Sequence, residues 1–144
     1  FTLRDTSDFS LGMDAETIDK LKSLTIRTYM INGFPIDVNV QVYFTDTLYN
    51  VIDSLITGGA STLILPGGPV DANGKVVTPM TDQRDYTYDN ARVNKFFTAK
   101  KTVVKAVLKT ANNPAIDDVK FFSTDRLTIK LGVKASASIH LGSN

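Results

Sequence analysis

Apolar side chains occupy every second position from residue 127 to residue 141, and this alternation is the strongest constraint in the sequence. The apolar positions are Leu127, Ile129, Leu131, Val133, Ala135, Ala137, Ile139 and Leu141. A period of two is typical of a β-strand that buries one face. We therefore predict a long final strand whose apolar face lies in the core, and we expect a charge at Ile129 or Leu131 to unfold the domain. The opposite, polar face carries Thr128, Lys130, Lys134, Ser136, Ser138 and His140.

Two more alternating segments flank the dipeptide Asn32-Gly33. Residues 24–31 alternate before it, and residues 36–44 alternate after it with an apolar side chain at every even position. Asn-Gly tolerates the positive φ angles of a tight two-residue turn, so the pattern predicts a β-hairpin. Tyr29 and Tyr43 would lie on the polar faces of its two strands, and we expect them to pair across the strands on one surface.

Shorter segments complete the predicted sheets. They cover residues 1–12, 49–55, 63–65, 76–77, 85–88, 104–108 and 119–122. Asp14 and Asp89 each precede a short helical pattern and are predicted N-caps. Turn signals recur about every 8 to 12 residues, a spacing typical of antiparallel sandwiches rather than of parallel βαβ folds. The predicted fold is mostly β: an antiparallel immunoglobulin-like β-sandwich of about eight strands with one or two short helices.

The composition is that of one globular domain over residues 1–144, with 42% hydrophobic and 22% charged residues. Sixteen basic and fifteen acidic side chains give a net charge of +1 without a charged block, so we expect no nucleic-acid partner. No apolar run approaches the ~20 residues that cross a bilayer, so we expect no membrane-spanning segment. The chain begins at Phe1 without an initiator Met, and we expect it to be a fragment of a longer or processed chain.

The residue types that usually carry catalysis are scarce. His140 is the single histidine and falls on a polar strand face, Glu16 is the single glutamate, and cysteine is absent. The common pairings of a nucleophile with a base need those groups. Turn and capping roles explain most of the aspartates. These are Asp37, Asp46, Asp53, Asp71, Asp82, Asp85, Asp89, Asp117, Asp118 and Asp125. We therefore predict that the chain is not an enzyme and holds no cofactor.

The segment Asp71-Ala72-Asn73-Gly74 begins like a calcium-binding EF-hand loop. That loop needs three oxygen ligands at alternate positions before the glycine and a glutamate near its end. Only two such residues precede Gly74, and no glutamate follows. We interpret the segment as a hairpin turn and predict no metal site.

The order of these turns and strands resembles an uncharacterised β-sandwich domain of secreted or lipid-anchored cell-surface proteins of Bacteroidota-type bacteria. The matching segments cover nearly the whole chain and are turns and strands rather than catalytic signatures. They are residues 1–6, 32–38, 43–46, 51–55, 65–66, 71–77, 119–122 and 127–135. The resemblance implies an extracellular location on the bacterial outer membrane and no active site.

Two short motifs are similar to the acceptor site for O-glycosylation in those bacteria. In Asp46-Thr47-Leu48 and Asp53-Ser54-Leu55, an aspartate precedes a hydroxyl residue and an apolar residue follows it. Thr47 and Ser54 are therefore candidate glycan acceptors.

Three functional hypotheses remain open. The first is a non-catalytic structural or adhesive module of an exported bacterial cell-surface protein. The second is a module that binds a glycan or another small ligand, with Tyr29 and Tyr43 as its candidate residues. The third is a subunit of a surface assembly that joins a protein partner or a second copy by β-strand addition, for which the long final strand is the candidate element.

Overall fold

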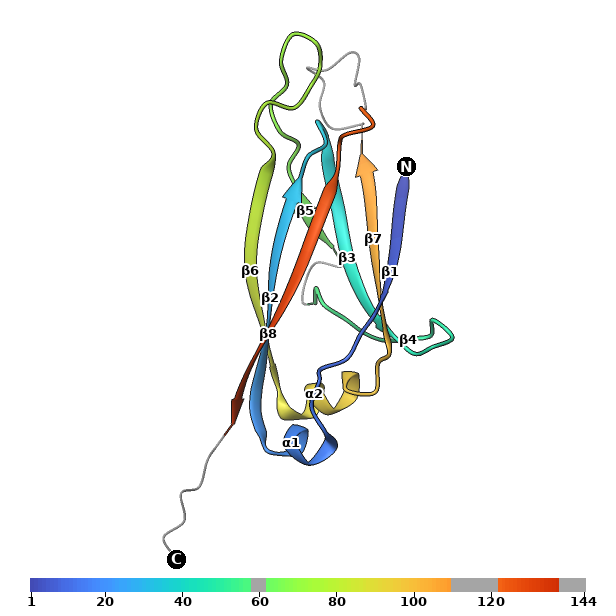
Figure 1. The fold of residues 1–144 in the computed structure, drawn as a ribbon, viewed down its shortest axis with the longest axis vertical. Coiled ribbons are helices and arrows are strands. Elements are labelled where there is room, and N and C mark those ends of the chain that lie inside the picture. The colour runs from blue at the N-terminus through green and yellow to red at the C-terminus, as the bar shows by residue number, and fades with distance from the viewer. Residues whose placement is uncertain (58–61, 110–121, 138–144) are drawn as a thin grey trace, which may run out of the picture.

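The computed structural model describes residues 1–57, 62–109 and 122–137, and in them the chain forms eight strands and two short helices (Figure 1). The elements are β1 (Thr2–Asp8), α1 (Ala15–Asp19), β2 (Leu21–Asn32), β3 (Asp37–Thr45), β4 (Val51–Ser54), β5 (Leu63–Leu65), β6 (Met80–Asp89), α2 (Asn90–Phe96), β7 (Lys101–Lys109) and β8 (Leu127–Ala137). The prediction of a mostly β sandwich with one or two short helices is confirmed. An immunoglobulin-like strand order stays a prediction.

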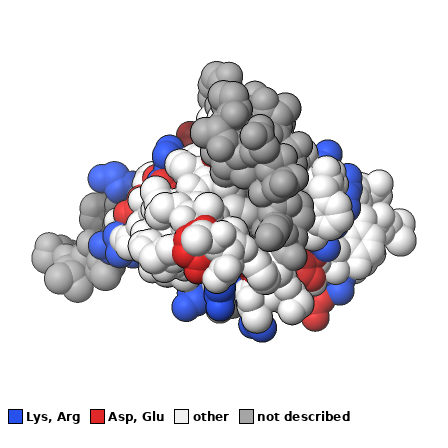
Figure 2. All heavy atoms as spheres, turned by 90° about the horizontal axis from the view of Figure 1, so that it is seen from above, with Lys and Arg blue, Asp and Glu red and all other residues white. Residues whose placement is uncertain are grey.

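Two antiparallel sheets form the layers. The first sheet has the order β1-β7-β3-β4, with β5 also pairing with β3, and the second has the order β6-β2-β8. Both helices lie at the lower end of the sheets in Figure 1. Lys and Arg side chains are interspersed with Asp and Glu on the face that Figure 2 shows, as expected for a small net charge. No helix in the described residues is long and apolar enough to cross a membrane.

The core consists of two clusters between the sheets. Near the helices, Phe44 of β3 stacks on Phe96 of α2 with ring centroids 5.2 Å apart, and Leu24 and Ile26 of β2 are buried against them. The other cluster contains Met30 of β2 together with the following residues of the first sheet and its loops. These are Ile36, Val38, Val40, Ile56, Leu63, Leu65, Ala106 and Leu108. The alternation in residues 36–44 therefore predicted the buried face of β3 correctly.

Both predicted helix caps are confirmed. The Asp14 carboxylate accepts a hydrogen bond from the Thr17 amide at 2.8 Å, and the Asp89 carboxylate accepts one from the Arg92 amide at 2.9 Å. Each aspartate satisfies a donor that the first helical turn leaves unpaired. The hydrogen bonds to Thr17 also lower the pKa of Asp14.

The predicted hairpin between residues 24–31 and 36–44 is wrong, because β2 and β3 belong to different sheets. Gly33 does not adopt the positive φ that an Asn-Gly hairpin turn uses. Its amide instead donates to the Arg126 carbonyl at 2.8 Å, and a Cβ at this position would lie 2.7 Å from the same oxygen. Gly33 is therefore required for a close backbone contact with the segment before β8, and the chain passes from one sheet to the other.

Asn32 holds this crossover in place from inside the core. Its side chain is fully buried, and its amide nitrogen donates to the carbonyls of Ile36, Leu65 and Pro66 at 3.0, 3.2 and 2.9 Å. Its side-chain oxygen accepts from the Phe34 amide at 2.9 Å. One side chain thus joins the end of β2, the start of β3 and the end of β5.

The final strand differs from its prediction in how much of it is buried. Leu127 and Ile129 pack against the core, but 37% of Leu131 and 48% of Val133 are exposed, and Ala135 is exposed as well. The expectation that the whole apolar face is core is therefore wrong for Leu131, Val133 and Ala135. A charge at Leu131 has access to water and should not unfold the domain. Residues 138–144, including His140, lie outside the described residues.

Several shorter segments also differ from expectation. The strand predicted at 85–88 runs over all of Met80–Asp89, and the strand predicted at 49–55 begins only at Val51 because Tyr49 has a φ of 64°. Residues 76–77 contribute one bridge, between Val70 and Val76, rather than a strand. Most of the strand predicted at 119–122 lies outside the described residues.

We predict that Asn32→Ala lowers the free energy of unfolding by about 2–4 kcal/mol, because it leaves buried carbonyl groups without donors. Asn39→Ala is the matched control: Asn39 is half-buried on the outer face of β3, and its loss should cost less than about 1 kcal/mol. Urea unfolding measures both. Equal midpoints for the two variants would contradict the assigned role of Asn32.

Candidate functional site: the open side between β1 and β8

The strands β1 and β8 are edge strands of the two different sheets. Within the described residues, β1 pairs only with β7, and β8 pairs only with β2. An edge strand presents a row of backbone N–H and C=O groups that are not bonded within its own sheet. Its free side can accept a further strand.

The apolar residues of β8 point toward the interior but become exposed along the strand. Ile129, Leu131 and Val133 lie opposite Met30, Thr28 and Ile26 of β2, which are all buried. Paired residues on neighbouring strands point to the same face, so Leu131 and Val133 face the first sheet. Leu131 and Val133 are exposed because no described strand lies along the edge of β8 that is opposite to β2.

A hollow of about 500 Å³ separates β8 from β1. Leu3 and Ser7 of β1 line one side, Leu127 and Ile129 of β8 line the other, and Phe34 and Ala106 lie between them. Leu127, Ile129, Phe34 and Leu3 also pack against the second core cluster. In the part of the chain that the structure describes, the sandwich is therefore open along this side, and the opening reaches core residues.

The outer face of β8 is cationic. Lys130 and Lys134 make no ion pair within the described residues. The nearby Asp85 is committed to Arg27, whose Nε and Nη2 donate to its two oxygens at 2.8 and 2.9 Å. These hydrogen bonds, together with the charges of Arg27 and Lys134, outweigh the effect of desolvation and lower the pKa of Asp85.

The structure does not bring Tyr29 and Tyr43 together. Tyr29 lies on the outer face of the second sheet between Gln83 and Lys130, whereas Tyr43 lies on the outer face of the first sheet between Val103 and Ser54. The predicted cross-strand pair is therefore wrong, because it depended on the hairpin. Tyr43 instead lines a hollow with Tyr49.

The two candidate glycan acceptors have different surroundings. Thr47 is exposed in the turn that follows β3, and Ser54 is half-buried at the end of β4 opposite Tyr43. The Ser54 carbonyl accepts a hydrogen bond from Arg92 at 2.8 Å, and the Ser54 amide donates to Asp53 at 2.8 Å. Glycosylation of both residues stays a prediction.

Most of the aspartates that the structure describes have structural partners. Asp46 accepts the amides of Leu48 and Asn50 at 2.8 and 2.9 Å, and Asp37 accepts the Gly67 amide at 3.0 Å. Asp125 accepts the Phe122 amide at 2.9 Å. Asp117 and Asp118 lie outside the described residues.

The Asp71 loop forms the predicted hairpin turn. One Asp71 oxygen accepts the amides of Asn73 and Lys75 at 2.8 and 3.0 Å, and Gly74 adopts a φ of 82°. The described residues contain no group of three His, Asp or Glu side chains that could hold a metal ion.

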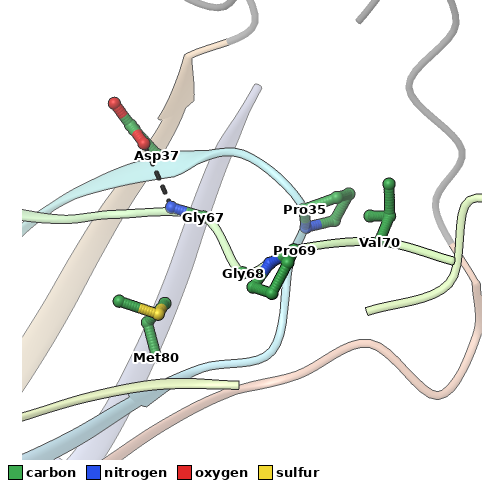
Figure 3. A pocket seen from close by; sticks show the side chains of 7 residues that line it. All are labelled: Pro35, Asp37, Gly67, Gly68, Pro69, Val70 and Met80. Carbon is green, nitrogen blue, oxygen red and sulfur yellow. Dashed lines mark hydrogen bonds between the residues drawn. The ribbon is translucent and has the colours of Figure 1, made fainter. Parts of the chain in front are cut away.

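A second hollow, of about 490 Å³, lies where the loop after β5 crosses the start of β3 (Figure 3). A Cβ on Gly67 would lie 2.6 Å from the Pro35 carbonyl oxygen, so glycine permits this close crossing. The side chain of Met80 and the ring of Pro69 complete the wall. The Asp37 carboxylate accepts a hydrogen bond from the Gly67 amide. We therefore attribute this hollow to the packing of the two crossing segments.

Asp53 and Arg92 form the most buried ion pair in the described residues. Arg92 Nε donates to Asp53 Oδ2 at 3.0 Å and Nη2 donates to Oδ1 at 3.1 Å, while the guanidinium lies 4.2 Å from the Tyr88 ring centroid. Burial alone would raise the pKa of Asp53, but hydrogen bonds from Arg92 and Ser54 and the positive charge of Arg92 hold it below its usual value. This ion pair connects β4 with α2.

Sequence reasoning missed both the exposure of β8 and the hollow that Tyr43 and Tyr49 line together. Signals for the edge position exist in the strand itself, because Gly132 interrupts it and Lys130 and Lys134 flank that glycine. Lysine and glycine are typical of edge strands rather than of central ones. No comparable local signal indicates Tyr49.

No protein-family model and no curated protein matches the chain. Among solved structures, it is similar to the VP2 subviral particle of infectious bursal disease virus, with 13% identity and a TM-score of 0.20, over 92% of this chain and 39% of that one. A structure of the Gx strain of the same virus has 10% identity and a TM-score of 0.20, over 94% of this chain and 34% of that one. The chain spans well under two thirds of either neighbour's length. TM-scores this low carry no argument about shared fold or function.

We predict that Asp53→Asn destabilises the protein by about 1–3 kcal/mol at neutral pH, because it leaves Arg92 without its carboxylate partner. The folded-state pKa of Asp53 is lowered, so its contribution is present above the unfolded pKa of about 3.9 and is lost as the pH falls through the folded pKa. The stability difference between wild type and variant should therefore shrink below about pH 4.

Urea unfolding at neutral and acidic pH measures this difference. Asp85→Asn, which breaks the exposed pair with Arg27, is the control and should have a smaller effect at neutral pH. A difference for Asp53→Asn that stays constant on acidification would show that the carboxylate charge is not what stabilises the fold.

Proposed function

We propose that the chain is a non-catalytic structural or adhesive module of an exported bacterial cell-surface protein, and that it joins a protein partner by β-strand addition along β8. The observation that carries the proposal is the exposure of inward-facing Leu131 and Val133 on an edge strand. An edge strand with exposed apolar side chains and an unpaired backbone is the typical acceptor for an added strand.

The energetics favour an added strand over a loose apolar contact. A strand beside β8 would pair with the N–H and C=O groups that have no partner among the described strands, and it would cover Leu131 and Val133 from the side. Covering the exposed part of each of these side chains is worth on the order of 1 kcal/mol. The backbone hydrogen bonds along β8 would then set the length and the register of the added strand.

The surface of β8 also indicates the chemistry of the partner strand. Side chains of an added strand alternate between the two faces of the sheet. Those directed inward would contact Leu131 and Val133 and should be apolar. Those directed outward would lie near Lys130 and Lys134 and should be acidic. The preferred partner is thus an extended segment in which apolar and acidic residues alternate.

The contacts of the aspartate carboxylates agree with a structural role for the chain. Asp14 and Asp89 cap helices, Asp53 and Asp85 pair with arginines, and Asp46 closes a turn. A general acid or base needs a carboxylate that is available to a substrate. The location at the cell surface of a bacterium is supported by the resemblance of the strand and turn motifs to those of exported surface domains.

We expect the whole chain to bind a synthetic peptide of about nine residues that alternates valine with aspartate, a length suited to one strand. Hydrogen exchange followed by NMR should show new protection at alternate amides of β8, namely those that point away from β2. Val133→Lys should weaken peptide binding about tenfold or more, which corresponds to about 1.4 kcal/mol. Because half of Val133 is already exposed, the variant should unfold at nearly the same urea concentration as wild type.

Ser136→Lys is the matched control, because it adds the same charge to an exposed position on the opposite face of β8. It should bind the peptide at least as well as wild type does. A scrambled peptide that binds equally, or protection that appears away from β8, would refute strand addition. Light scattering over a range of concentrations distinguishes a second copy of the chain from a different partner.

A further inference from the structure

On the outer face of the first sheet, two residues of like charge lie directly opposite each other. Arg4 of β1 and Lys105 of β7 are paired residues, and they point to the same side of the sheet. Like charges at such positions repel each other. Neither residue forms an ion pair within the described parts of the chain. Farther along the same two strands, Asp8 and Lys101 form an ion pair with each other, so the positive charge of Lys101 has a partner that Arg4 and Lys105 lack among the described residues.

These two cations line a hollow of about 450 Å³, which lies within the usual range of about 300–1,000 Å³ for small-molecule sites. Tyr43 of β3 and Tyr49 of the β3–β4 turn line it, together with Val51 and Val103. Val103 is 8% exposed, whereas Val51 is 61% exposed and Tyr49 is 51% exposed. The hollow thus combines two aromatic rings, a partly apolar surface and two cations.

The turn that presents Tyr49 is closed by hydrogen bonds to the Asp46 carboxylate. Asp46 accepts hydrogen bonds from the Leu48 amide, the Asn50 amide and the Asn50 side chain at 2.8, 2.9 and 3.0 Å. Tyr49 adopts the left-handed backbone conformation, with a φ of 64°. This conformation is unfavourable for a tyrosine. The side chain is therefore placed at the rim of the hollow by a turn that the Asp46 carboxylate stabilises.

We propose that this hollow binds an acidic sugar, with its carboxylate between Arg4 and Lys105 and its ring against Tyr43 and Tyr49. A carboxylate relieves the repulsion between the two cations, and the arginine fork matches its two oxygens. The apolar face of a pyranose ring packs against an aromatic ring, and the tyrosine hydroxyls are hydrogen-bond partners for sugar hydroxyls. A simple inorganic anion would use the cations but not the two rings. This binding site is separate from β8 and does not depend on strand addition.

The test is calorimetric titration of the whole chain with oligogalacturonate and with its methyl-esterified form, which has the same sugar rings without the negative charges. We expect the free acid to bind, the ester to bind at least about tenfold more weakly, and added salt to weaken the binding of the acid. Equal binding of acid and ester would overturn the proposal. Failure of the acid to bind, or complete displacement by sulfate at an equal concentration, would also overturn it.

Two variants locate the binding. Arg4→Gln should weaken binding of oligogalacturonate about tenfold or more. Tyr49→Asn removes the ring while retaining a residue that tolerates the left-handed conformation, and it should also weaken binding. The matched controls in the second sheet are Lys22→Gln, at an exposed position of β2, and Tyr29→Thr, which should leave binding unchanged. If the control variants lose as much affinity as Arg4→Gln and Tyr49→Asn, the site is not this hollow.

Discussion

The side-chain amide of Asn32 donates to three carbonyl groups in the interior, and the path of the chain depends on these hydrogen bonds. They join the end of β2 to the start of β3 and to the loop after β5. A buried amide with all its partners satisfied favours one arrangement, because every alternative leaves polar groups unpaired in the interior. The crossover that replaces the expected hairpin is stabilised in this way, and it places β2 and β3 in opposite layers.

The position of β8 follows from that crossover. Because β3 pairs with β7 in the first sheet, β2 is free to pair with β6 on one side and with β8 on the other. The Gly33 amide bonds to the Arg126 carbonyl and brings the start of β8 alongside the end of β2. The long final strand therefore becomes an edge, and its apolar face extends beyond the part that the first sheet covers. The same crossover that completes the core leaves the side between β1 and β8 open among the residues that the structure describes.

The two proposed contacts use different physical properties of the two sheets. Along β8, the edge that no other described strand pairs with and the exposed Leu131 and Val133 favour an extended protein segment. On the outer face of the first sheet, Arg4 and Lys105 with Tyr43 and Tyr49 favour a small ring that carries a carboxylate. One contact is at an edge of one sheet and the other on the outward face of the opposite sheet. The pairing of adhesion to a partner chain with recognition of a surface sugar is consistent with an exported module.

The sequence by itself determined much of the local structure, although not the turn at Asn32-Gly33. Period-two alternation identified the buried face of β3 and the existence of β8, and Asp14 and Asp89 identified the starts of both helices, because these signals act between residues close in the chain. Only the tertiary structure decided which strands pair and which faces are covered. Alternation shows that Leu131 and Val133 point to one side, but whether another layer lies over that side depends on residues far away in the sequence. For the same reason Tyr43 lines a hollow with Tyr49 and lies in a different sheet from Tyr29, because the neighbours of a strand residue are set by sheet order and not by spacing in the sequence.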